Sequence, residues 1–148
     1  MPRGTYFSDF EIGQQFVSVG RTITEADVVA FAGISGDYNP LHTDATFAEK
    51  TPFGQRIAHG MLLMSVSTGL GQTLGIFEGT TLALKGNTIE YKAPVFFGDT
   101  IRLRLTVDST KPSSRGGAGT VVFRSDILKQ DDTLAVTGTW IVLFRDRG

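Results

Sequence analysis

Apolar and polar residues alternate strictly in one segment of the C-terminal half of the chain. Between residues 100 and 108, every second side chain is apolar: Ile101, Leu103, Leu105 and Val107. Such alternation is typical of an antiparallel strand with one buried and one solvated face. Residues 82–91, 119–129 and 133–145 are also rich in β-branched or aromatic side chains, and clusters of turn-forming residues separate them. This half of the chain therefore predicts four long antiparallel strands.

The N-terminal half begins with a short alternating segment and a helix signal. Residues 15–19 alternate as a strand does. Thr24 precedes acidic residues and an apolar stripe, a pattern that predicts a capped helix start. The glycines at positions 33 and 36 are expected to end this helix.

The middle of the chain combines helix breakers with a strongly apolar segment. Gly36 and Pro40 are expected to keep residues 35–41 out of a helix. Asp44 then predicts the cap of a short helix. Residues 59–70 are apolar nearly all round, which is typical of a helix buried on every side.

The order of these elements predicts the fold class. One short strand, a set of helices and four long strands indicate an α+β protein with an antiparallel sheet. A long apolar helix followed by such strands is best buried when the sheet wraps around the helix. The length of 148 residues is typical of a single domain, which is expected to cover residues 1–148.

Composition narrows the range of possible partners and sites. Fourteen basic and fifteen acidic residues give a net charge of -1, so neither nucleic acid nor a membrane surface is expected as a partner. The absence of cysteine excludes disulfides and thiolate ligands, and two histidines make a multi-histidine zinc site unexpected. No secretory signal or membrane-spanning stretch is recognisable, which favours a cytoplasmic location.

An aspartate and a histidine lie five residues apart in a segment that Pro40 holds out of a helix. Asp37 and His42 could therefore converge on one small reactant. A carboxylate and an imidazole are suited to proton transfer near neutral pH. The same composition also suits an ordinary turn, with Asp37 and Asn39 as turn formers and His42 on the surface. Spacing alone leaves both interpretations open.

Two motifs give the chain a family resemblance. Residues 35–42 read Ser-Gly-Asp-Tyr-Asn-Pro-Leu-His, and residues 57–62 read Ile-Ala-His-Gly-Met-Leu about twenty positions later. In this order they resemble the MaoC-like (R)-specific enoyl-CoA hydratases, and the similarity covers nearly the whole chain. The resemblance implies a hot-dog fold, in which an antiparallel sheet wraps around a long central buried helix. It also implies a homodimer with active sites at the subunit interface.

The resemblance assigns roles to the first motif. It implies that Asp37 and His42 are the catalytic pair and that Asn39 holds their loop. The reaction of such enzymes is syn addition of water to a trans-2-enoyl-CoA, or the reverse dehydration of an (R)-3-hydroxyacyl-CoA. The pair would act on one water, and which residue is acid and which is base stays open. The coenzyme A thioester is the substrate, and neither a cofactor nor a metal is expected.

The second motif contributes an expected oxyanion site. Gly60 opens the apolar helix, where backbone N–H groups are free and the helix dipole is positive. Its N–H is expected to stabilise the thioester oxygen, unless the glycine only marks a helix start. Ser65 and Thr68 follow on the same helix as supporting residues, although such hydroxyls commonly bond to their own helix. His59 is interpreted as a residue that supports the site or caps the helix, and it is not counted as catalytic.

Two other functions remain open at this point. A hot-dog acyl-CoA thioesterase would hydrolyse the thioester instead of hydrating the alkene, and a non-catalytic module would only bind an acyl thioester. The presence of both Asp37 and His42 argues against each of them. Either coenzyme A or an acyl carrier protein could carry the acyl group, and the sequence does not predict the chain length.

Overall fold

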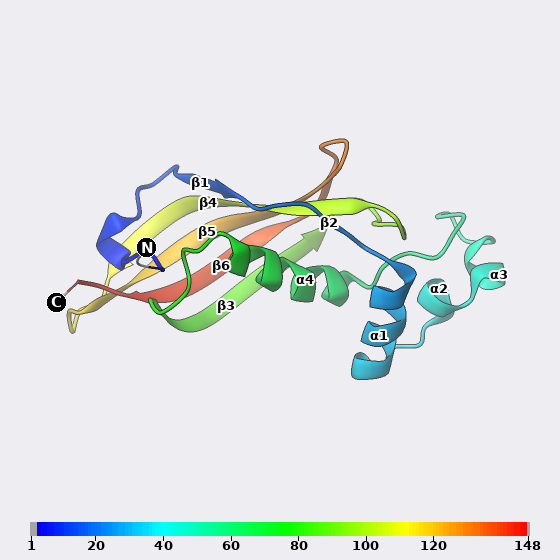
Figure 1. The fold of residues 1–148 in the computed structure, drawn as a ribbon, viewed down its shortest axis with the longest axis horizontal. Coiled ribbons are helices and arrows are strands. Elements are labelled where there is room, and N and C mark those ends of the chain that lie inside the picture. Colours follow the sequence, from blue (N-terminus) through cyan, green and yellow to red (C-terminus); the bar gives the residue numbers. More distant parts are fainter. Residues whose placement is uncertain (1–2, 148) are drawn as a thin grey trace.

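The computed structural model describes residues 3–147 and has the expected α+β architecture (Figure 1). The helical elements are η1 (Phe7–Asp9), α1 (Glu25–Ser35), α2 (Pro40–Thr43), α3 (Ala45–Ala48) and α4 (Gly60–Thr73). The strands are β1 (Gln15–Val17), β2 (Arg21–Thr22), β3 (Thr81–Tyr91), β4 (Thr100–Pro112), β5 (Ala118–Lys129) and β6 (Leu134–Arg145).

All strands pair antiparallel in one sheet. The order is β1-β4-β5-β6-β3, and β2 also pairs with β4. The predicted alternation in β4 is confirmed, because its apolar side chains are at most 1% exposed: Ile101, Leu103, Leu105 and Val107. These side chains face α4, so the sheet wraps around that helix and one core lies between them. The predicted helix-in-sheet arrangement is thus confirmed.

The prediction that the long helix is buried on every side was wrong. One face of α4 carries the buried residues Leu62, Leu63, Met64, Val66, Ser67, Leu70 and Gly71. Met61, Ser65 and Thr68 lie on the opposite face and are exposed. The sheet curves around only part of the helix, so an apolar composition all round did not guarantee burial all round.

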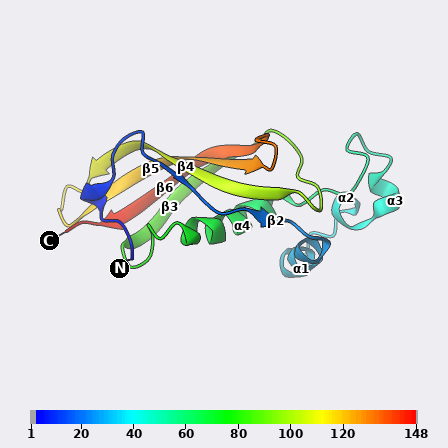
Figure 2. The same ribbon diagram turned by 45° about the horizontal axis from the view of Figure 1, so that its top comes forward.

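Helices α1, α2 and α3 lie at one end of the sheet, and both ends of the described chain lie at the other end (Figures 1 and 2). Thr24 caps α1 as predicted, through a reciprocal pair of hydrogen bonds with Asp27. Asp44 also caps its helix as predicted, accepting the Phe47 N–H at 3.0 Å. These caps fix the starts of α1 and α3, the two helices between which Asp37 and His42 lie.

Some predicted boundaries differ from the structure. The first strand ends at Val17 and the pair Arg21–Thr22 forms an additional short strand that was not predicted. Pro40 was expected to exclude a helix, but it begins the helical turn α2. Proline at the first helical position loses no helix hydrogen bond, because the N–H of that position has no partner in any case.

None of the helices within residues 3–147 has both the length and the apolar character needed to cross a bilayer.

Candidate active site

Asp37 lies directly after α1, in a loop shaped by local hydrogen bonds. Gly36 ends the helix with φ of 76°, a left-handed conformation that favours glycine. The Asp37 N–H donates to Ser35 Oγ at 3.1 Å, and Asp37 Oδ1 accepts the Asn39 N–H at 3.2 Å. The Asp37 side chain is 52% exposed, and its second oxygen, Oδ2, faces His42.

His42 is held by the helical turn α2 and by a backbone carbonyl. The Asn39 amide oxygen caps this turn by accepting the Leu41 N–H at 3.0 Å. His42 Nδ1 lies 2.8 Å from the carbonyl oxygen of Ile57. A carbonyl oxygen can only accept, so the neutral ring carries its hydrogen on Nδ1 and leaves a lone pair on Nε2. That lone pair points to the side of the ring where Asp37 lies.

The two residues leave a gap between their functional atoms. His42 Nε2 and Asp37 Oδ2 are 4.0 Å apart. This distance is too long for a direct hydrogen bond. It suits one water that bonds to both atoms, with each contact about 2.8 Å long. The structure therefore brings together the two residues that the sequence singled out.

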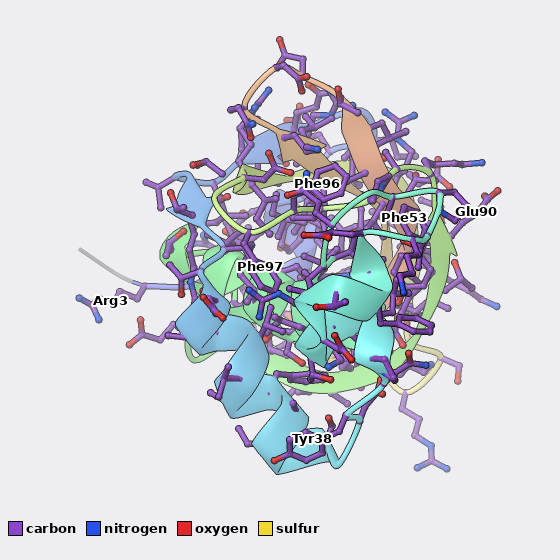
Figure 3. All side chains as sticks on the ribbon, turned by 90° about the vertical axis from the view of Figure 1, so that its right-hand side faces the viewer. Arg3, Tyr38, Phe53, Glu90, Phe96 and Phe97 are labelled. Atoms are coloured by element: carbon purple, nitrogen blue, oxygen red, sulfur yellow. The ribbon has the colours of Figure 1, made fainter. Side chains whose placement is uncertain are left out.

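A pocket of about 340 Å³ opens beside His42. Most of its lining is apolar, including Phe53, Ile57, Ala58, Leu63, Pro94 and Val95. Figure 3 looks onto this end of the molecule, where Phe53 lies on the same side as Glu90 of β3. An apolar pocket with a few polar atoms at one place is typical of a site for a small, largely hydrocarbon ligand.

Asp99 holds one wall of this pocket. Its carboxylate accepts the Phe96 N–H at 2.8 Å and pairs with Lys129 Nζ at 2.7 Å. Burial alone would raise the pKa of Asp99, but hydrogen bonds from Gln130, Lys129 and Phe96 outweigh burial and hold this pKa below its usual value. Lys129 also donates to the carbonyl of the lining residue Pro94 at 3.2 Å. The pocket wall is thereby tied to the end of β5.

Gly60 lines the same pocket as the first residue of α4. Within residues 3–147, its N–H has no hydrogen-bond acceptor, as expected for the first turn of a helix. The structure adds a second reason for glycine at this position. A Cβ there would lie 2.4 Å from Tyr91 Cζ, so a side chain at position 60 would require the exposed Tyr91 ring to shift. This contact was not predictable from the sequence.

Ser65 and Thr68 follow Gly60 on the exposed face of α4. Ser65 Oγ donates to the Met61 carbonyl at 2.9 Å, and Thr68 Oγ1 donates to the Ser65 carbonyl at 2.7 Å. Neither hydroxyl bonds to Asp37 or His42 in the part of the chain that the structure describes. Their hydroxyls bond instead to their own helix, the alternative recognised from the sequence.

His59 belongs to the site, where the sequence allowed a supporting or capping role for it but gave it no specific contact. It is 2% exposed, and its ring stacks on the ring of His42 at a centroid distance of 3.9 Å. Asp37, His42 and His59 each have a ligand-type atom within 4.8 Å of the others. The two imidazoles are nearly parallel, however, so their in-plane lone pairs run side by side and do not converge on one ion. The geometry is better suited to proton transfer than to metal binding.

Comparison with known proteins gives a family match over most of the chain. A family model described as the MaoC like domain matches residues 9–126. The (R)-specific enoyl-CoA hydratase of Rhodospirillum rubrum is 39% identical over 111 residues, which are 74% of each chain. The (R)-specific enoyl-CoA hydratase of Aeromonas caviae is 38% identical over 133 residues, covering 89% of this chain and 93% of that protein.

Solved structures agree with this match. The unliganded R-hydratase from Pseudomonas aeruginosa superposes with a TM-score of 0.82 at 29% identity, covering 98% of this chain and 88% of that one. A Mycobacterium tuberculosis protein with a double hot-dog fold superposes with a TM-score of 0.78 at 21% identity, covering 97% of this chain and 45% of that one. The chain therefore has the hot-dog fold.

Proposed function

Because the chain belongs to the MaoC-like domain family, we propose that it hydrates the 2,3 double bond of a trans-2-enoyl thioester, or dehydrates the corresponding (R)-3-hydroxyacyl thioester. The relatives named (R)-specific enoyl-CoA hydratases support this class of reaction. The observation that carries the proposal is the gap of 4.0 Å between Asp37 Oδ2 and His42 Nε2 beside an apolar pocket.

The expected tautomer of His42 supports a specific role for each residue of the pair. With its Nδ1–H donated to the Ile57 carbonyl, His42 offers Nε2 as the base that takes a proton from water. Asp37 accepts the other hydrogen of that water and orients its oxygen toward C3. The imidazolium then returns a proton to C2 on the same face. The net result is syn addition of water, with no cofactor in the reaction.

Gly60 serves the same step by stabilising negative charge. Attack at C3 moves an electron pair onto the thioester oxygen, which needs a hydrogen-bond donor. The free N–H of Gly60 lies at the positive end of α4 and lines the pocket that also contains His42. This N–H is the proposed donor. Asn39 supports the site by capping α2, whereas a role for Ser65 and Thr68 remains a prediction.

A second copy of the chain is the proposed partner. The outer edge of β3 has no strand beside it within the described residues, because β3 pairs only with β6. Apolar side chains are exposed near this edge, with Leu82 at 47%, Leu84 at 56% and Met61 of α4 at 58%. Pairing of two copies would cover both the strand edge and these side chains. The acyl group is carried by coenzyme A or by an acyl carrier protein.

A single assay with two readouts tests this function. Crotonyl-CoA is incubated with the protein, and the enoyl absorbance and the release of free thiol are followed together. Hydration consumes the alkene and releases no thiol. Release of thiol would instead identify a thioesterase, and binding without loss of the alkene would identify a non-catalytic module.

A further inference from the structure

His59 contacts both members of the catalytic pair from a buried position. Its ring stacks on His42 with centroids 3.9 Å apart and planes at 29°, and its Nε2 lies 2.9 Å from the carbonyl oxygen of Asp37. Resting on the proposed function, we infer that His59 is a positioning residue that holds Asp37 and His42 at their working separation. It acts through the Asp37 backbone and the face of the His42 ring, and among the described residues it makes no hydrogen bond to Asp37 Oδ2 or His42 Nε2.

The hydrogen bond to Asp37 fixes the hydrogen on the His59 ring. A carbonyl oxygen only accepts, so Nε2 must donate and Nδ1 keeps a lone pair. His59 Nδ1 is buried and has no partner among residues 3–147. Phe31 closes another side of the ring at a centroid distance of 5.0 Å. An unsatisfied buried nitrogen costs free energy, and an apolar side chain would fill the same space without that cost. The presence of histidine here therefore favours a role for its Nε2–H.

The contact between His59 and Asp37 links two distant parts of the chain. The other hydrogen bonds of Asp37 are to Ser35 and Asn39, each two residues away. The bond to His59 joins positions 22 residues apart. Among described residues it is the one long-range hydrogen bond that anchors the Asp37 backbone. The residue that makes it is the same residue that supports the face of His42.

The place of His59 in the fold extends this role to the oxyanion site. His59 immediately precedes Gly60 and is the N-cap residue of α4, with φ of -59° and ψ of 138°. A shift of His59 would therefore move the Gly60 N–H together with Asp37 and His42. Small displacements of this kind can cost about a hundredfold in rate.

Three substitutions separate the two contacts of His59. His59→Leu removes both the ring and the donor. His59→Phe keeps a ring that can stack on His42 but has no donor, and His59→Gln keeps a donor N–H but has no ring. Ser67→Ala is the matched control, because Ser67 is fully buried on α4 and its hydroxyl bonds only to the Met64 carbonyl.

Kinetics and NMR spectroscopy provide the readouts. With crotonyl-CoA, we expect His59→Leu to lower kcat about ten- to a hundredfold with KM changed less than about threefold. His59→Phe and His59→Gln should each recover part of the loss, and Ser67→Ala should stay near wild type. The chain has two histidines, so His42 is the one imidazole left in every His59 variant. Its ¹⁵N spectrum should change from the Nδ1–H form to a mixture of both tautomers in His59→Leu.

The outcomes distinguish failure of this inference from failure of the proposed function. If the wild-type protein were inactive on enoyl thioesters, the proposed function would be contradicted. The tautomer of His42 in the His59 variants would still show whether His59 positions His42. Folded His59→Leu with kcat within twofold of wild type and an unchanged Nδ1–H tautomer would show that His59 is only packing. If His59→Leu does not fold, His59→Phe and His59→Gln carry the test, and wild-type kcat in both would overturn the inference.

Discussion

At the scale of single residues, Asp37 and His42 face each other across a gap that suits one water. Asp37→Asn keeps the shape of the side chain but removes its charge, and His42→Ala removes the proton acceptor. Each change should lower the rate of hydration at least about a hundredfold, the usual loss for an acid or base group. The double variant should be little worse, because the two groups act as one unit. Steady-state kinetics with crotonyl-CoA measures this, and activity within tenfold of wild type in a folded single variant would contradict it.

Gly60 needs a test that separates its N–H from its lack of a side chain. A side chain at this position would collide with Tyr91, so Gly60→Val would disturb the packing whatever the role of the N–H. In a Tyr91→Ala background the collision is removed, and Gly60→Pro then deletes only the N–H. Proline is tolerated at the first position of a helix, and the extended conformation of His59 suits a residue that precedes proline.

The matched control for this comparison is Gly60→Ala in the same Tyr91→Ala background, which keeps the N–H. We expect Gly60→Pro to lower kcat about 10²- to 10³-fold relative to this control, the usual loss for one oxyanion donor. Circular dichroism checks that α4 is preserved. Equal kcat values for the alanine and proline variants would assign the oxyanion to another donor.

The sequence could predict the residues of the site but not all the contacts that arrange them. Asp37, His42 and Gly60 were found because motifs place them in order along the chain. The contact between the Ile57 carbonyl and the His42 ring was not predictable. Every residue has a backbone carbonyl, so the residue type does not indicate which carbonyl accepts this hydrogen bond. The contact of His59 with the Asp37 carbonyl was not predictable either, because the two residues lie 22 positions apart.

At the scale of elements, a buried carboxylate joins three strands. Asp126 of β5 is 3% exposed, pairs with Arg104 of β4 at 2.8 Å and accepts from Thr137 of β6 at 2.8 Å. Burial alone would raise the pKa of Asp126. The hydrogen bonds from Arg104 and Thr137 and the charges of Arg124 and Arg104 outweigh burial, so this pKa lies below its usual value of 3.8.

This lowered pKa predicts how stability depends on pH. The carboxylate stabilises the folded state above the pKa of the unfolded chain, and the contribution is lost as pH falls through the lower folded pKa. Asp126→Asn should therefore cost roughly 1.5–3 kcal/mol of unfolding free energy at pH 7, the range for a hydrogen bond to a charged group. The difference from wild type should shrink as the pH is lowered below about 4.

Denaturant unfolding at several pH values measures this difference. Asp108→Asn is the control, because Asp108 is exposed on β4 and should change stability by less than about 0.5 kcal/mol. If the two variants lost the same stability at pH 7, Asp126 would have no special role in joining the strands.

The elements themselves were largely predictable where local chemistry decides them. Thr24 and Asp44 cap helices as expected. Alternation located one of the four long strands, and β-branched and aromatic residues between turn clusters located the other three. The short strand Arg21–Thr22 was missed because its pairing with β4 is set by the distant partner and not by its own two residues. The exposed face of α4 was missed because hydrophobicity does not tell how far a sheet reaches around a helix.

At the scale of the whole molecule, the outer edge of β3, which has no neighbouring strand among the described residues, predicts a homodimer. Light scattering coupled to gel filtration should give twice the chain mass of 16.0 kDa. Leu84→Lys places a charge on this edge and should shift the mass toward that of one chain. Val19→Lys, at a side chain that is 64% exposed outside β3, should leave the mass unchanged. A wild-type protein that has the mass of one chain and full activity at nanomolar concentration would refute the dimer.

The sequence predicted how the helix and the sheet are layered, but not the full arrangement of the strands. A long apolar helix and alternating strands predicted a sheet wrapped around a helix, but the strand order did not follow from their patterns. That order places β3 at the edge and brings Tyr91, at its end, against Gly60 of α4. Contacts between residues so far apart depend on the complete fold.

The stereochemistry of addition tests the central claim most directly, because Asp37 and His42 lie beside one gap and would act on one face of the substrate. Crotonyl-CoA is converted in ²H₂O, and the 3-hydroxybutyryl product is analysed by NMR for the relative configuration at C2 and C3 and by chiral chromatography for the configuration at C3. The account predicts a single (R)-3-hydroxy diastereomer, with deuterium and hydroxyl added to the same face. An (S) product, a mixture of C2 diastereomers at early conversion or an unchanged alkene would contradict it.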